Sequence, residues 1–177
     1  MEISQAITAE DLDLAPVFGQ LDDAATGRVL AELRRAESTL AALRDELGLE
    51  GEALTLERYP SGQAEIVTNL KGAAGKLTFE AGLRPRNFFS ETPWQPGYAP
   101  RSMMTDAWDV DGNVRVMVRR LVGTHKYTIQ ETPEEIEEQR FDSPAEAAAA
   151  LAAVTERLAE LARSREATVD AWAPPES

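Results

Sequence analysis

Several stretches of the chain contain residue types that occur in catalytic or ligand-binding sites. The first of these stretches is similar to a phosphate-binding loop. Residues 71–78 read Lys-Gly-Ala-Ala-Gly-Lys-Leu-Thr. The phosphate-binding motif requires Gly-x₄-Gly-Lys followed by Ser or Thr, but here Leu70 stands at the first glycine position and Leu77 follows the lysine. The stretch also leads into a predicted strand, so no helix N-terminus would face a phosphate. We interpret it as a glycine-rich connection between strands.

An acidic stretch at residues 106–113 is similar in composition to a calcium-binding loop. When this stretch is aligned with the EF-hand loop, no ligand residue stands at the first or at the last coordinating position, which argues against a calcium site. Asp111-Gly112 is instead typical of a tight hairpin turn, because both turn positions favour positive φ. This interpretation predicts a hairpin in which Val110 pairs with Asn113.

Acid–base and nucleophilic chemistry have no recognisable motif in this sequence. His125 is the only histidine, there is no cysteine, and no serine motif for a nucleophile is present. Four carboxylates fall on the polar side of predicted strands by alternation: Glu57, Glu65, Glu80 and Asp106. We interpret them as a solvated face, and expect no metal site, no cofactor and a function other than catalysis.

The most unusual stretch of the sequence is residues 84–101, which we expect to form a long loop. It holds four of the eleven aromatic residues, together with four prolines and three arginines. The aromatic residues are Phe88, Phe89, Trp94 and Tyr98. Because the prolines break a helix or an inner strand, the aromatic side chains either pack as a lid or are presented to a partner.

Further candidate binding residues follow in the strands after this loop. With a turn at Asp111-Gly112, alternation puts one set on the sheet face that helices leave open: Met104, Asp106, Trp108, Arg115, Met117 and Arg119. Trp108 opposite Arg115 would suit cation–π stacking, and aromatic, methionine and arginine residues are typical of interface hot spots. In the alternative, the loop folds over this face and its aromatic side chains fill a second small core.

Length and charge limit the class of protein. A chain of 177 residues fits one domain, and its net charge of −13 argues against an overall nucleic-acid binder. The charge is uneven, because residues 66–130 hold nine Lys or Arg against five acids, which leaves −17 for the remainder. With no apolar run of membrane-spanning length and no recognisable secretion signal, we expect a cytoplasmic protein of bacterial type and no membrane partner.

Two amphipathic helices are predicted near the ends of the chain. Leucines at helical spacing predict a helix from about Asp23 to Gly48, where a glycine ends it. Residues 143–146, Ser-Pro-Ala-Glu, combine an N-cap serine, proline at N1 and a capping-box glutamate, and they predict a second helix that ends near Arg165. The domain is therefore expected over residues 23–166, after an arm at 1–22 and before a tail at 167–177.

Strands are predicted between the two helices. Residues 54–59 and 63–70 flank a Pro-Ser-Gly turn and predict a hairpin, and residues 76–83 alternate strictly between apolar and polar side chains. Strands resume at residue 102, and a turn at 123–124 would pair Val118 with Ile129. Residues 132–140 are interpreted as a surface turn or short helix.

The predicted fold is α+β: one antiparallel sheet of about five to six strands, in two meanders, with the N- and C-terminal helices packed on one face. The sheet's other face would be open or covered by the long loop. This layout and the acidic charge are similar to those of small bacterial adaptors such as secretion chaperones and immunity proteins, although layout alone does not give function.

Two functional hypotheses follow. The first is a non-enzymatic protein-binding module that uses the aromatic–arginine loop and the open sheet face to hold a protein partner or a second copy of itself. The second is a small-molecule-binding protein or cofactor-independent enzyme with a pocket between sheet and loop, where Arg115 or Arg119 grips an anionic ligand. Single-stranded nucleic-acid binding is disfavoured by the acidic ends of the chain.

Overall fold

The computed structural model describes residues 3–7, 12–59, 64–72, 77–87, 104–122, 125–130 and 134–172 of the chain. The elements follow in the order β1 (Ile3–Ala6), α1 (Ala15–Phe18), α2 (Asp23–Leu47), β2 (Thr55–Arg58), β3 (Ala64–Lys71), β4 (Leu77–Asn87), β5 (Met104–Val122), β6 (His125–Gln130), β7 (Glu134–Phe141) and α3 (Pro144–Trp172). Within these residues, no helix combines the length and the apolar character that crossing a membrane would need.

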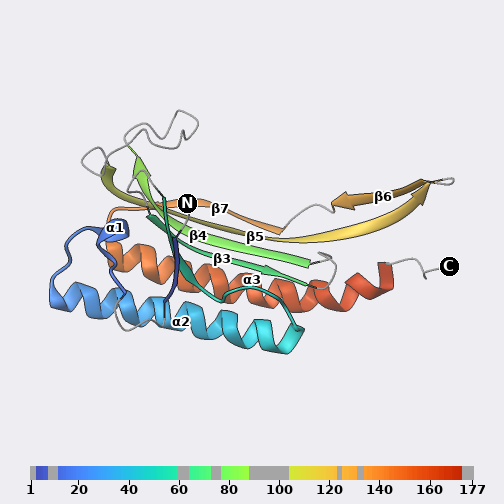
Figure 1. The fold of residues 1–177 in the computed structure, drawn as a ribbon, viewed down its shortest axis with the longest axis horizontal. Helices are drawn as coiled ribbons and strands as arrows, with labels where there is room; N and C mark the ends of the chain where they lie inside the picture. The colour runs from blue at the N-terminus through green and yellow to red at the C-terminus, as the bar shows by residue number, and fades with distance from the viewer. Residues whose placement is uncertain are drawn as a thin grey trace.

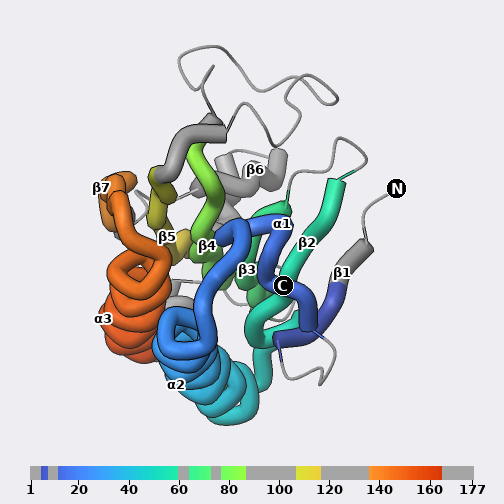
Figure 2. Tube along the Cα trace, turned by 90° about the vertical axis from the view of Figure 1, so that its left-hand side faces the viewer, coloured from blue at the N-terminus to red at the C-terminus, as the bar shows by residue number. Residues whose placement is uncertain are grey.

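The strands form one antiparallel sheet, which confirms the predicted α+β fold class. In the described part of the chain the sheet has seven strands, in the order β1-β2-β3-β4-β5-β6, and β7 also pairs with β5. The two long helices, α2 and α3, lie side by side on one face of this sheet (Figures 1 and 2). The region expected as an N-terminal arm contributes β1, which extends the sheet beside β2, and the short helix α1.

The hydrophobic core lies between the helices and the sheet. The side of helix α2 that faces the sheet consists of buried residues at helical spacing: Val29, Leu33, Ala36, Leu40 and Leu43. The strands contribute alternate residues from the facing side, including Leu56, Ile66, Phe79, Leu83 and Val114. Because successive strand residues point to opposite sides, the polar residues between them fall on the face away from the helices.

Both long helices begin at side-chain caps. The Asp22 carboxylate accepts a hydrogen bond of 2.7 Å from the Ala25 backbone N–H at the start of α2, and Gly48 ends that helix in the left-handed conformation (φ 64°). The Ser143 hydroxyl accepts one of 3.4 Å from the Glu146 N–H at the start of α3. Helix α3 then continues to Trp172, past its predicted end, since residues 165–172 contain neither glycine nor proline to stop it.

Replacing Ser143 with alanine should lower the free energy of unfolding by about 1 kcal/mol, because the first turn of α3 loses its capping acceptor. Urea denaturation followed by circular dichroism measures this change. An unfolding midpoint equal to that of the native chain would show that the cap contributes nothing.

The first meander is paired as predicted. Strands β2 and β3 form the expected hairpin, with Thr55 opposite Val67, and β3 pairs in turn with β4, with Leu70 opposite Phe79. Strand β4 runs on to Asn87, four residues into the stretch that was expected to be loop. The register shifts between Pro85 and Asn87, where the proline interrupts regular pairing with β5.

The predicted hairpin at Asp111-Gly112 is wrong. Strand β5 passes through these residues without a turn, and β4 pairs along it with Gly82 opposite Asp111 and Ala81 opposite Gly112. Each residue has another role: the Asp111 carboxylate binds Arg84 on the neighbouring strand, and Gly112 leaves room for the side chains of α3. The Asp-Gly sequence, although typical of turns, therefore lies here within a continuous strand, where the aspartate forms an ion pair and the glycine allows close packing.

The far edge of β5 carries two strands in succession. Strand β6 pairs from Val122 opposite His125 back to Met117 opposite Gln130, so the predicted register, with Val118 opposite Ile129, is confirmed. The predicted turn at 123–124 lies outside the described residues. Strand β7 then pairs with β5 from Glu134 opposite Val114 onwards. The prediction of a surface turn or helix at 132–140 is therefore wrong, because these residues find backbone partners on the free edge of β5. Their many charges suit an edge strand.

Candidate functional site

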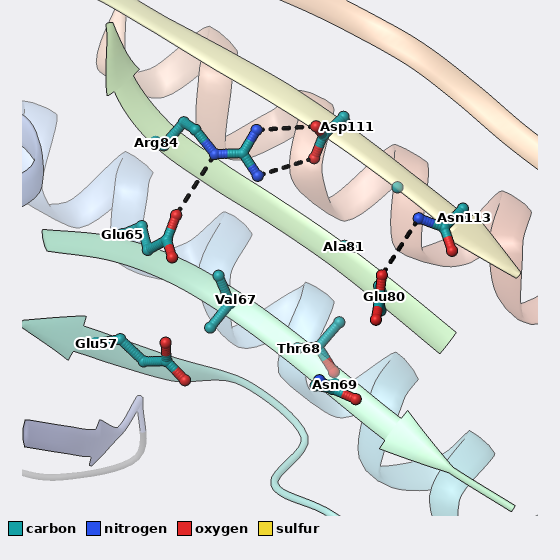
Figure 3. A pocket seen from close by; sticks show the side chains of 11 residues that line it. Glu57, Glu65, Val67, Thr68, Asn69, Glu80, Ala81, Arg84, Asp111 and Asn113 are labelled. Atoms are coloured by element: carbon teal, nitrogen blue, oxygen red, sulfur yellow. Dashed lines mark hydrogen bonds and ion pairs between the residues drawn. The ribbon is translucent and has the colours of Figure 1, made fainter. Parts of the chain in front are cut away.

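The face of the sheet opposite α2 and α3, hereafter the outer face, gathers polar side chains on adjacent strands. Alternation brings them to one side of β2 to β5, where they line a shallow hollow of about 300 Å³ (Figure 3). The polar side chains that line it include Glu57, Glu65, Asn69, Glu80, Arg84, Asp111 and Asn113. The described part of the outer face is therefore polar, and Glu57, Glu65 and Glu80 lie on it as alternation predicted.

Arg84 is the centre of this surface. Its Nη1 and Nη2 atoms donate to the two oxygens of Asp111 at 2.8 and 3.2 Å, and its Nε donates to Glu65 at 3.4 Å (Figure 3). Glu138 on β7 adds a carboxylate oxygen 3.7 Å from Nη1. Burial disfavours the charge, but the hydrogen bond and charge of Asp111, then those of Glu65, outweigh it and raise the pKa of Arg84 above its usual value. The guanidinium is thus a fixed cation held by a bidentate pair.

Carboxylates exceed the positive charge around Arg84. Glu57 and Glu65 are direct partners across β2 and β3, so two like charges lie on the same side of adjacent strands. The Tyr59 hydroxyl has one proton, and both carboxylates lie within hydrogen-bonding distance to accept it, Glu57 at 3.4 Å. Asp111 and Glu138 add two further negative charges to the single guanidinium. This part of the outer face therefore carries net negative charge and attracts cations.

Two further arginines on this face are also close to carboxylates: Arg86 Nη1 lies 3.6 Å from Asp109 Oδ1, and Arg115 lies beside Glu80. Glu80 lies 4.0 Å from Arg115 Nη2 and accepts a hydrogen bond of 3.4 Å from the Asn113 amide. The excess of carboxylates on the described outer face is therefore confined to the surroundings of Arg84, and this is the part of the outer face that suits binding of cationic groups. Among the described residues, no three His, Cys, Asp or Glu side chains come together in a way that could hold a metal ion.

Trp108 does not lie on this surface, and its predicted exposure was wrong. Its side chain is only 6% exposed, its indole Nε1 donates a 3.0 Å hydrogen bond to the Val17 carbonyl, and its ring lies 5.9 Å from that of Phe18. Without a turn at Asp111-Gly112, Trp108 shares a face with the buried Val110 and not with Arg115. The expected cation–π pair between Trp108 and Arg115 is therefore absent.

The other predicted binding residues fall into three groups. Arg115 lies on the outer face, opposite Thr78 of β4, as expected. For four residues the structure describes the backbone, within β5, but not the side chain: Met104, Asp106, Met117 and Arg119. The aromatic residues of the long segment lie outside the described residues: Phe88, Phe89, Trp94 and Tyr98.

Sequence reasoning missed the residues at the centre of the site. Arg84 was assigned to the loop and Asp111 to a turn, although Glu57, Glu65 and Glu80 were placed on the polar side of their strands. The signal was present in β4: its strict alternation from Leu77 to Leu83, carried on by one residue, puts Arg84 on the same side as Glu80. The chain matches no protein-family model, no curated protein and no solved structure.

Proposed function

We propose that this protein is a non-enzymatic protein-binding module whose outer face holds a basic segment of a protein partner. The observation that carries the proposal is the excess of carboxylates around Arg84, on a sheet face opposite the two long helices. Lysine or arginine side chains of the partner would bind these carboxylates through charge-assisted hydrogen bonds.

A protein segment suits this surface better than a small cation. The polar side chains extend over four adjacent strands and the hollow between them is shallow, so an extended ligand can reach several carboxylates at once. Exposed ion pairs contribute only about 0.2–1 kcal/mol each, so useful affinity needs several of them together. Val67 offers an apolar contact in the middle of the same surface.

An anionic small molecule is supported less well. Its binding would need a guanidinium that is free to receive it, whereas Arg84 is held by Asp111 and Glu65, and Arg115 lies beside Glu80. An anion would have to displace these carboxylates and lie among the others, which costs the energy of both steps.

The proposal is tested with a synthetic peptide of alternating lysine and valine, whose binding is measured by calorimetry at low salt. The face variant, Glu57→Lys with Glu138→Lys, reverses two charges beside Arg84 and should weaken binding about tenfold or more, since attraction becomes repulsion. A control variant, Asp45→Lys with Glu160→Lys, makes the same change in net charge on α2 and α3, where both residues are exposed. It should keep most of the affinity.

Equal weakening in the face and control variants would mean that the peptide responds to net charge and not to this surface. A native chain that is monomeric in the same buffer, and therefore has its outer face free, but fails to bind the peptide at low salt would also contradict the proposal. Circular dichroism of both variants confirms that they fold before binding is compared.

A further inference from the structure

Among the described residues, one end of the sheet narrows to two strands. Pairing between β4 and β5 ends at Leu77 opposite Val116, whereas β5 and β6 remain paired from Met117 to Val122. Figure 1 shows β5 and β6 running on past the end of β4. We name residues 117–130 the β5–β6 ribbon.

The ribbon is the basic part of an acidic chain. Residues 112–130 contain no Asp or Glu, although the whole chain has 31 acids among 177 residues. Within the ribbon, Arg119 is paired with Thr128, Arg120 with Tyr127 and Lys126 with Leu121. By this register and strand alternation, Arg119 and Lys126 occupy positions of one face of the ribbon and Arg120 a position of the other.

The ribbon and the outer face are opposite in charge and similar in length. The six paired residues of β5 in the ribbon extend about 20 Å at 3.3–3.4 Å per residue, and the four strands β2 to β5 span about 15 Å from first to last at 4.8 Å per step. A ribbon laid across these strands can therefore reach from Glu57 on β2 to Asp111 on β5. Both surfaces belong to the same chain.

We propose that the basic segment held by the outer face is the β5–β6 ribbon of a second copy of this chain. In a dimer with a twofold axis, the ribbon of each copy binds the outer face of the other copy. Both pairs of surfaces are then occupied, so the assembly is closed. This inference rests on the proposed function, because it names the partner of the same surface. A nucleic acid is the competing partner for a basic ribbon, but the residues beyond the ribbon carry a net charge of −16 and would repel it.

The oligomeric state is measured first, by sedimentation velocity on the full chain. We expect a dimer at about 0.05 M salt that shifts towards monomer at about 0.5 M, because salt screens the charges that join the surfaces. Two variants then address the two surfaces separately. The ribbon variant, Arg119→Glu with Arg120→Glu, makes the ribbon acidic, and the face variant, Glu57→Lys with Glu138→Lys, makes the outer face less acidic and adds cations to it.

A mixture of the two variants gives the decisive result. Each variant alone should be a folded monomer, since its ribbon and outer face then carry like charges. Mixed in equal amounts, they should form a heterodimer, because the acidic ribbon meets the basic face and the basic ribbon meets the acidic face. This recovery cannot arise from a variant that has failed to fold, and circular dichroism checks each one before mixing.

Several results would overturn the inference. A native chain that is monomeric at low salt, a mixture that stays monomeric, or a dimer that survives either variant would each do so. A monomer that retards a DNA duplex in a gel, and loses this in the ribbon variant, would assign the ribbon to nucleic acid. If the native monomer still binds the lysine–valine peptide through the outer face, the proposed function stands and only the second copy is excluded as its partner.

Discussion

A chain carrying Trp108→Ala should lose about 3–5 kcal/mol of its free energy of unfolding. The indole is buried at the junction of β5 and α1, where it packs on Phe18 and donates a hydrogen bond to Val17. Its removal leaves a large cavity and an unpaired carbonyl, and the surrounding structure can collapse into that space only in part. Urea denaturation gives the loss directly, and α1 should be the first element to lose protection in hydrogen exchange.

Two variants make this result specific. Trp108→Phe keeps most of the apolar volume but leaves the Val17 carbonyl without its donor, so we expect an intermediate loss of about 1–3 kcal/mol. Arg115→Ala changes a residue of the same strand on the outer face and should cost less than about 1 kcal/mol. If all three variants unfolded at the midpoint of the native chain, Trp108 would not be part of the core.

The second large effect is expected from Gly112→Ala, which should destabilise the fold by about 1–3 kcal/mol. A Cβ atom at this position would lie 2.5 Å from Leu158 Cδ1, 3.0 Å from the Glu80 carbonyl oxygen and 3.1 Å from Val154 Cγ1. Leu158 is fully buried and one neighbour is backbone, so neither can move away freely. Alanine in a strand gains about 0.5–1 kcal/mol over glycine, which is smaller than the cost of overpacking.

Gly27→Ala is the matched control for Gly112→Ala. Gly27 is an exposed residue of α2, and an added Cβ would meet nothing within 4 Å. The same change should therefore stabilise the protein by up to about 1 kcal/mol, because alanine favours the helix. Opposite signs for the two substitutions would confirm that α3 packs closely on β5 at Gly112. A stabilising effect at both positions would mean that the helix and strand are farther apart than the structure places them.

Local signals in the sequence predicted much of this fold. The leucine stripe with Gly48 at its end located α2, and the capping residues Ser143 to Glu146 located the start of α3, whereas the Asp22 cap is seen only in the structure. Alternation placed Leu77, Phe79, Ala81 and Leu83 on the core side, where all four are buried. Helix signals and strand alternation depend on residues close together in the sequence, so they can be recognised without the tertiary contacts. In this protein the tertiary packing agrees with them.

The candidate site was predicted less well because its residues depend on partners far along the chain. Asp111-Gly112 has the composition of a tight turn, and only the approach of α3 and the guanidinium of Arg84 explain why the strand continues. Because of that error, Trp108 and Arg115 were expected on the same face of the sheet, whereas they lie on opposite faces. Strand β7 was missed for a similar reason, since its glutamates suit a loop until β5 offers a free edge.

The pairing of Asn87 with Met104 bears on how the aromatic segment between them can be studied. The two residues are cross-strand neighbours, so the chain leaves β4 and enters β5 at nearly the same point. A two-residue turn can therefore replace the sixteen residues 88–103 without altering the strand register. Closing the shorter connection removes about 2 kcal/mol of chain entropy cost. Excision thus tests whether Phe88, Phe89, Trp94 and Tyr98 take part in partner binding, separately from what the sheet needs in order to fold.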